Sequence, residues 1–134
     1  MAEISCNHSG NLDKAKQLIH AARYAGADAI KLQTYTPGEL TTKAHPELGA
    51  FYEKAQTPRE WHVELFDYAR KIGITTFSSA FSVDGVKFLK SLGVPAIKIA
   101  SAEINDRPLI KAAMNAGVPL IVSTGMAELG DFQQ

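Results

Sequence analysis

Two hydrophobic patterns alternate along the chain, one typical of buried strands and one typical of helices. Short apolar runs bounded by turn-forming residues lie at 2–5, 27–34, 74–81, 96–103 and 119–124. Between them, apolar positions recur at helical spacing over 12–24, 57–71, 83–91 and 108–115. The short runs predict strands buried on both faces, and the periodic stretches predict amphipathic helices.

Cap and stop residues sharpen these boundaries. Asn11, Ser82 and either Asn105 or Asp106 are suited to N-caps, and Thr57 with Glu60 has the spacing of a capping box. Four predicted helices stop at a glycine (Gly26, Gly73, Gly93 and Gly117), with the next strand starting within three residues. This repeat predicts right-handed crossover units and a parallel α/β sheet of five strands.

Two stretches fit the repeat less well. Residues 35–56 have a loop-like composition, with a short helical turn expected around 48–54. Such a long connection in a compact domain is usually functional or mobile. After Gly125 the pattern predicts the start of a further helix.

Composition excludes several classes of protein. The 134 residues suit one domain, and a formal net charge of zero gives no sign of a nucleic-acid or acidic-membrane surface. No apolar run approaches the roughly 18 residues of a membrane span. The single cysteine, Cys6, excludes an internal disulfide, and we expect a cytoplasmic protein.

Polar residues gather at the carboxyl ends of the predicted strands, where parallel α/β folds bind their ligands. Lys31 and Lys98 supply positive charge there, and hydroxyl donors follow at Ser78, Ser79, Ser101, Ser123 and Thr124. This set favours a site for phosphate or carboxylate. Alternatively, the lysines extend into water while the serines satisfy local backbone, or one lysine forms a Schiff base.

Strand alternation raises a difficulty at the fourth strand. In a regular strand Lys98 lies on the opposite face from Ser101 and Glu103. These residues can serve one ligand only if the chain bends or bulges near Ala100, or if the lysine reaches over the edge. Glu3 and Glu103 are candidates for acid–base chemistry or for ion pairs with the lysines.

Histidines give weaker signals. His8 is a candidate metal ligand or proton carrier, whereas His62, on an amphipathic helix, is expected at the surface. No set of three metal ligands can be assembled from the sequence, and the glycine-rich dinucleotide and P-loop motifs are absent.

Five motifs in chain order resemble the sialic acid synthase family. They are AEISCNHSG at 2–10, GADAIKLQT at 26–34, FSSAF at 77–81, KIASAE at 98–103 and STGM at 123–126. The stretches QTYTP at 33–37 and TPREWH at 57–62 are most similar to the pseudaminic acid synthase branch. The resemblance implies a TIM (β/α)8 barrel followed by an antifreeze-like domain. Residues 1–134 would then form a truncated barrel of five βα units, without the later strands and that domain.

The same resemblance implies a reaction and roles for the candidate residues. Phosphoenolpyruvate would condense through C3 with the aldehyde of an N-acetylated amino-sugar, water would add at C2, and phosphate would leave. Lys31, Ser79, Lys98, Ser101 and Ser123 would bind phosphoenolpyruvate. Glu3 would act at the reacting carbons, and Gln33, Phe81 and Glu103 would face the sugar.

The family uses a divalent metal, Mn²⁺ or Mg²⁺, whose histidine ligands come from later strands, so this chain is expected to hold no metal and to be inactive alone. The full-length protein is expected to be a homodimer. Alternatives are synthesis of N-acetylneuraminate or legionaminate, a Schiff-base aldolase, and a non-catalytic anion-binding half-barrel that pairs with a partner chain.

Five strands without the rest of a barrel would leave a strand edge and an apolar sheet face exposed. We therefore expect the isolated chain to self-associate or to be poorly soluble. Light scattering together with thermal unfolding tests this, and a monodisperse monomer that melts cooperatively would contradict it.

Overall fold

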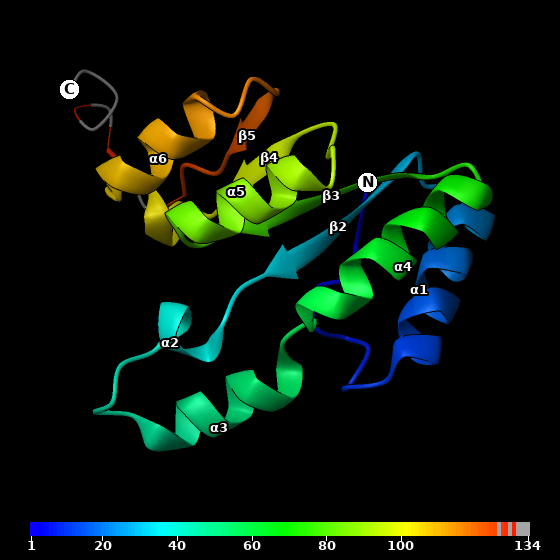
Figure 1. Cartoon of the computed structure of the whole chain (residues 1–134), viewed down its shortest axis with the longest axis horizontal. Coiled ribbons are helices and arrows are strands. Elements are labelled where there is room, and N and C mark those ends of the chain that lie inside the picture. The colour runs from blue at the N-terminus through cyan, green and yellow to red at the C-terminus, as the bar shows by residue number, and fades with distance from the viewer. Residues whose placement is uncertain (126, 129, 131–134) are drawn as a thin grey trace.

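A computed structural model describes residues 1–125, 127, 128 and 130 (Figure 1). Its centre is one parallel sheet whose five strands follow one another in chain order. The strands are β1 (Ala2–Glu3), β2 (Ala29–Thr34), β3 (Thr75–Ala80), β4 (Ile97–Ile99) and β5 (Leu120–Val122). The helices are α1 (Leu12–Tyr24), α2 (Pro37–Leu40), α3 (Pro46–Ala55), α4 (Arg59–Lys71), α5 (Val83–Ser91) and α6 (Arg107–Met114), with a 3₁₀ turn, η1 (Ser101–Glu103). The predicted α/β fold with a parallel sheet is confirmed.

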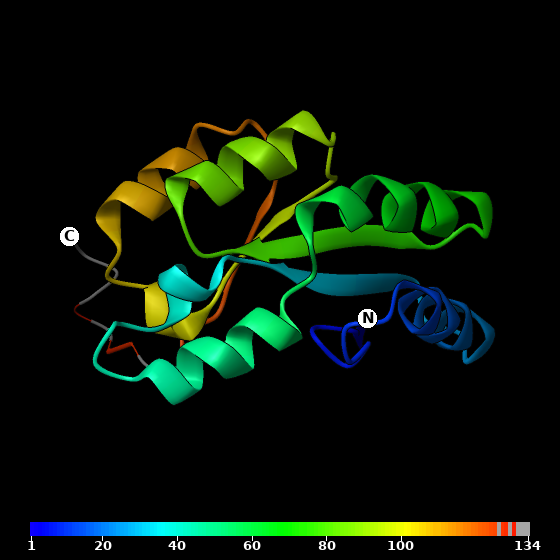
Figure 2. The same cartoon turned by 60° about the horizontal axis from the view of Figure 1, so that its bottom comes forward.

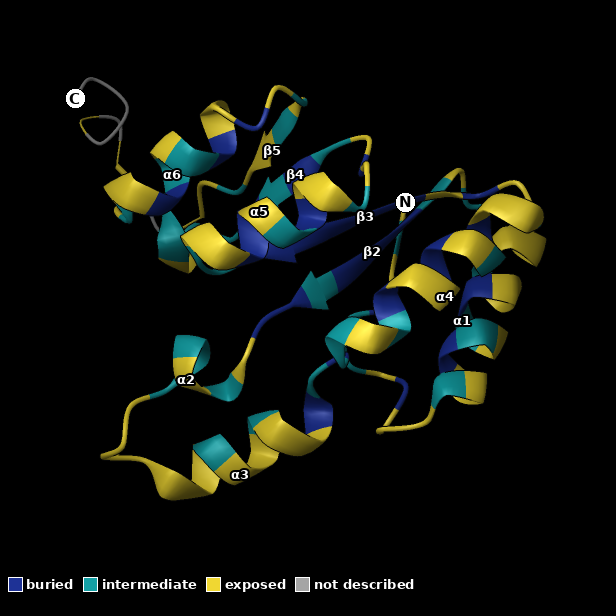
Figure 3. Cartoon of the chain, in the orientation of Figure 1, coloured by how far each residue is buried: buried dark blue, intermediate teal, exposed yellow. Residues whose placement is uncertain are grey.

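The apolar core lies between one face of the sheet and its helices. Ile30, Leu32, Ile97 and Ile99 alternate along β2 and β4, and all four are fully buried. They belong to one cluster with apolar residues of α1, α4, α5 and α6, among them Ile19, Leu65, Leu89 and Leu109. Figure 3 shows most of β3 buried, from Thr76 to Ala80, while the outward faces of the helices are exposed.

Most predicted boundaries are confirmed. Helices α1 and α5 span the residues predicted for them. The side chains of Asn11, Ser82 and Asp106 accept hydrogen bonds from backbone N–H groups three residues later, as N-caps do. The glycines that follow α1, α4, α5 and α6 all have positive φ, between 69° and 86°, which a residue with a side chain adopts only with strain. The helix predicted after Gly125 involves residues outside the described set.

The connection from β2 to α4 is more helical than predicted. The helical turn expected around 48–54 is confirmed and extends to α3, and α2 precedes it. Pro37 and Pro46 stand at or next to the first helical position, where a missing N–H costs nothing. The two helices pack against each other beyond the carboxyl end of β2, apart from the layer formed by the other helices (Figures 1 and 2). Phe51 is 58% exposed, so this segment lacks the strong apolar periodicity that identifies a helix in a sequence.

The prediction for the start of α4 is wrong. The helix begins at Arg59, its N-cap is Pro58, and no side chain caps it. The hydroxyl of Thr57 instead meets Nε2 of His8 at 3.0 Å, in a buried contact between the β1–α1 turn and the start of α4. Because the N–H of Gly10 donates to Nδ1 of His8, the neutral ring carries its proton on Nε2 and donates it to Thr57. The Thr57 hydroxyl, which the local sequence pattern predicts to cap α4, is used in a tertiary contact instead.

The prediction that His62 lies at the surface is also wrong. His62 is fully buried, and burial lowers the pKa of its imidazole. Nδ1 lies 3.0 Å from the carbonyl oxygen of Pro58 and therefore donates to it, so Nε2 accepts from the hydroxyl of Thr34 at 2.8 Å. Thr34 in turn accepts from Ser78 at 2.7 Å. This chain of hydrogen bonds joins α4, β2 and β3 on the helix-covered face.

No helix in the described part of the chain is long and apolar enough to cross a bilayer.

Two buried threonines on neighbouring strands provide a matched test of the hydrogen-bond chain. Thr34→Val removes the donor to Nε2 of His62 and leaves the hydroxyl of Ser78 only its 3.3 Å contact with the carbonyl oxygen of Ser79. This loss should lower the free energy of unfolding by about 1–3 kcal/mol. The hydroxyl of Thr76 is buried with no partner among the described residues, so Thr76→Val should be neutral or stabilising. Urea denaturation of both variants checks this, and equal losses would contradict it.

Candidate anion site

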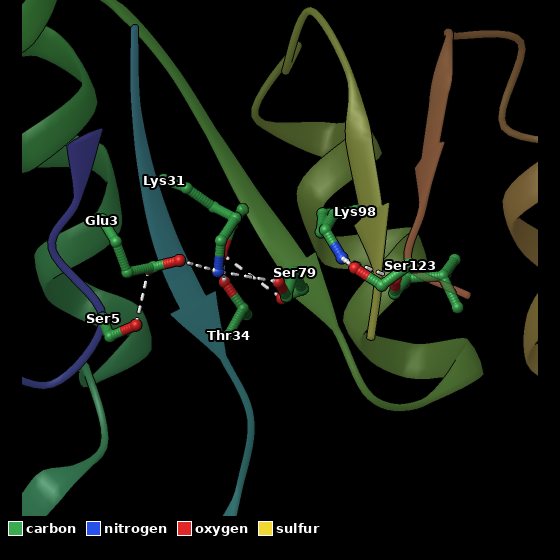
Figure 4. Close-up of polar contacts among 9 residues, drawn as sticks. Glu3, Ser5, Lys31, Thr34, Ser79, Lys98 and Ser123 are labelled. Carbon is green, nitrogen blue, oxygen red and sulfur yellow. Dashed lines mark hydrogen bonds and ion pairs between the residues drawn. The ribbon is translucent and has the colours of Figure 1, made fainter. Parts of the chain in front are cut away.

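The first half of the site is a three-strand contact around Lys31. Strand register places Lys31 beside Glu3 of β1, and Gln33 beside Ser79 of β3, so these side chains emerge on the face opposite the helices. The ammonium of Lys31 lies 2.5 Å from Oε2 of Glu3 and donates to the hydroxyl of Ser79 at 3.3 Å. Lys31 is only 6% exposed, so its charge is desolvated and these partners hold it in one orientation (Figure 4).

The second half joins β4 to the residue after β5. Lys98 is the register partner of Ser79 and so shares the face of Lys31. Its ammonium donates to the carbonyl oxygen of Ile99 at 2.8 Å and to the hydroxyl of Ser123. Figure 4 shows both lysines directed toward hydroxyls at the carboxyl edge of the sheet.

The charges of Lys31 and Glu3 in the first half affect the pKa of Lys98 in the second half. Burial is the main cause that lowers the pKa of Lys98, the like charge of Lys31 lowers it further, and Glu3 raises it. In the described part of the chain, Lys98 has only neutral partners, whereas Lys31 is paired with a carboxylate. Glu3, Lys31 and Lys98 together carry a net charge of +1, with donors of two strands beside them, which favours a small anion at this edge.

The bend considered near Ala100 is present. Strand β4 ends at Ile99, and Ser101 to Glu103 form η1, so strand alternation no longer fixes where these side chains lie. Ser123, rather than Ser101, is the hydroxyl that Lys98 contacts. Ser101 and Glu103 are half-buried, and burial together with the nearby Asp106 raises the pKa of Glu103. The structure thus brings together Glu3, Lys31, Ser79, Lys98 and Ser123, and leaves Ser101 and Glu103 on the adjoining turn.

The two other candidates for the sugar lie on the β2–β3 side. Gln33 is half-buried, next to Ser79 in the ladder. Phe81, two residues beyond Ser79, packs edge-to-face against Tyr35 with ring centroids 5.9 Å apart. Tyr35 makes a second such contact with Tyr52 of α3. Tyr35 and Phe81 therefore form an aromatic wall just beyond the ends of β2 and β3.

Sequence reasoning assigned no role to Ser5 or Tyr35. The hydroxyl of Ser5 donates to Oε1 of Glu3 at 2.5 Å, so both oxygens of this carboxylate are held. Tyr35 is 5% exposed, its hydroxyl has no partner among the described residues, and burial raises its pKa to about 12. An unpaired buried hydroxyl cannot be read from a sequence, and Tyr35 lies just beyond the end of β2, where strand alternation does not fix the direction of a side chain.

The residues at hand do not fit a metal ion. Among the described residues, no three histidine, cysteine, aspartate or glutamate side chains are grouped to hold one. Both ring nitrogens of His8 are engaged, with Gly10 and Thr57. No step through a metal is therefore derived from this chain, and the prediction that later strands supply the ligands stays a prediction.

Charge coupling across the site gives two opposite expectations for Lys98. Glu3→Gln removes a charge that raises the pKa of Lys98 and should lower that pKa further, whereas Lys31→Met removes a repulsive charge and should raise it. Titration of the lysine ¹³Cε resonances checks both. Shifts of the same sign in the two variants, or no shift in either, would show that the three groups are not coupled.

Comparisons with known proteins find relatives that match almost the whole of this chain. The chain is 42% identical to pseudaminic acid synthase of Helicobacter pylori, over 99% of this chain and 43% of that protein, and 44% identical to its Campylobacter jejuni counterpart, over 95% and 41%. The crystal structure of an N-acetylneuraminic acid synthetase from Leptospira borgpetersenii, in complex with citrate, superposes with a TM-score of 0.94 at 32% identity, covering 98% of this chain and 46% of that one.

The chain therefore spans less than half the length of these relatives, and its sheet corresponds to the first five βα units of a TIM-barrel-type synthase. The model of the NeuB family matches residues 18–134. On these grounds, the chain belongs to the NeuB family.

Proposed function

We propose that this chain forms the phosphoenolpyruvate-binding part of a nonulosonic acid synthase of the pseudaminate type. The observation that carries the proposal is the pair of lysines, one on β2 and one on β4, that share a sheet face and are each held by a hydroxyl of the next strand or its end. The relatives named pseudaminic acid synthases support the choice of product class.

In this proposal each lysine has a distinct task. Lys31 is already neutralised by Glu3, so it adds hydrogen bonds more than net charge. Lys98 has neutral partners only in the described residues and is the stronger attractor for an incoming anion. Phosphoenolpyruvate carries a phosphate and a carboxylate, so two ammonium groups on one edge match its two anionic ends. Ser79 and Ser123 would exchange their bonds to lysine for bonds to the ligand, and Ser101 is close enough along the chain to join them.

The reaction that this site would serve joins C3 of phosphoenolpyruvate to an amino-sugar aldehyde. Glu3 lies in contact with Lys31, so its carboxylate would stand beside the bound ligand and could accept a proton from the water that adds at C2. The aromatic wall of Tyr35 and Phe81, with Gln33 and Glu103, would receive the sugar. In this proposal the enzyme is cytoplasmic and dimeric, and the aldehyde is activated by a divalent metal held outside this chain.

Binding of phosphoenolpyruvate can be measured directly by calorimetry. Lys98→Met should weaken binding at least tenfold, or about 1.4 kcal/mol, because it removes the cation without a carboxylate partner. Lys90→Met makes the same change at an exposed position on α5 and should leave affinity within about twofold. Equal affinity of the two variants would refute the proposed site.

Turnover separates binding from complete catalysis. With Mn²⁺, phosphoenolpyruvate and the pseudaminate or N-acetylneuraminate precursor sugar, the 134-residue chain should release no phosphate, although it binds phosphoenolpyruvate. Release of phosphate by this chain alone would show that it contains a metal site of its own.

A further inference from the structure

Ser5 has an unfavourable backbone conformation at the edge of the site. Its φ is +43°, in the left-handed region that favours glycine, and Ser9 (φ +51°) is the one other non-glycine residue with positive φ in the described part of the chain. Strained residues persist only where their surroundings hold them, and they gather at functional sites. The strained conformation of Ser5 is therefore expected to serve a function.

The conformation turns the chain off β1 and back toward Glu3. The N–H groups of Ile4 and Ser5 both donate to the carbonyl oxygen of Lys31, at 3.0 and 3.3 Å, so the turn begins while the chain is still attached to β2. From there the Ser5 hydroxyl reaches Oε1 of Glu3 at 2.5 Å (Figure 4). A residue in extended conformation at this position would continue the strand and send its side chain along it.

Glu3 needs such a partner because its surroundings do not confine it. Its side chain is 47% exposed, and its other oxygen, Oε2, faces the ammonium of Lys31 at 2.5 Å. A single ion pair leaves a carboxylate free to rotate about its last bond, whereas two contacts to its two oxygens fix that rotation. Lys31, buried and bonded to Ser79, provides one fixed point, and Ser5 provides the second.

Ser9 shows that left-handed backbone in this turn does not by itself serve Glu3. Ser9 lies in the same turn and is exposed, and its hydroxyl accepts from the ammonium of Lys14 at 3.0 Å. Only Ser5, of the two strained serines, contacts the carboxylate.

We propose that Ser5 is a positioning residue that fixes the orientation of the Glu3 carboxylate toward Lys31 and the bound anion. The proposal rests on the proposed function for what Glu3 does, but not for the orientation itself. Ser5 transfers no proton in this role. The strained backbone of Ser5 directs its hydroxyl to the Glu3 carboxylate, and this hydrogen bond fixes the orientation of the carboxylate.

Glycine and alanine variants separate the hydroxyl from the strain. Ser5→Gly removes the hydroxyl and relieves the left-handed conformation, so its melting temperature should equal or exceed that of the parent, whereas Ser5→Ala keeps the strain and should melt lower. In both variants, side-chain couplings should show Glu3 averaging over rotamers, and the Lys98 titration should move to lower pH as Glu3 loosens. Ser9→Gly relieves the same kind of strain and should change neither the Glu3 rotamers nor the Lys98 titration.

Phosphoenolpyruvate affinity of Ser5→Gly should stay within about twofold, because both lysines remain. When Ser5→Gly is made in the full-length enzyme, kcat should fall about tenfold while KM for phosphoenolpyruvate stays within about twofold. A single Glu3 rotamer in Ser5→Gly, or the same averaging in Ser9→Gly, would overturn the positioning role. If the parent chain fails to bind phosphoenolpyruvate, the proposed function fails, and the rotamer and titration readouts still decide the role of Ser5.

Discussion

The strict alternation of side chains in a parallel ladder is the constraint on which the rest of this structure depends. On β2, Ile30 and Leu32 are fully buried against the helices, which commits Lys31 and Gln33 to the other face. The same rule on β4 buries Ile97 and Ile99 and leaves Lys98 between them on the side of Lys31. A slip of one residue in β2 or β4 would bury a lysine under the helices, so the apolar core and the charged site specify each other.

The pairing of the strands also determines which side chains the two lysines contact. Lys31 reaches a carboxylate on one neighbouring strand and a hydroxyl on the other, and Lys98 reaches a hydroxyl just past the end of its neighbour. Since adjacent strands are separated by about 4.8 Å, side chains from three strands meet without any special loop. The cost of burying Lys31 is offset by contacts that the fold itself supplies.

Much of this could be predicted from the sequence, and the failures share a cause. Caps at Asn11 and Ser82, glycine stops and the strand-end lysines are encoded within a few neighbouring residues, so local patterns identified them. Thr57 and His62 were misjudged because their partners, His8 and Thr34, lie 49 and 28 residues away. The helix α3 was underestimated because its exposed Phe51 obscures the amphipathic pattern. The backbone conformation of Ser5 has no local signal, since a left-handed φ in a serine is a property of the folded turn.

The order of the strands has a consequence for how the chain can be assembled. Each strand after β1 pairs with the one before it, so its partner has always been synthesised first. The contacts of Lys31 are complete once β3 is in place, because Glu3 and Ser79 both precede residue 81. The contacts of Lys98 are complete only after Ser123, the hydroxyl that it contacts, has been synthesised. During synthesis the paired lysine is thus satisfied early, and the lysine without a carboxylate is the last to find its partner.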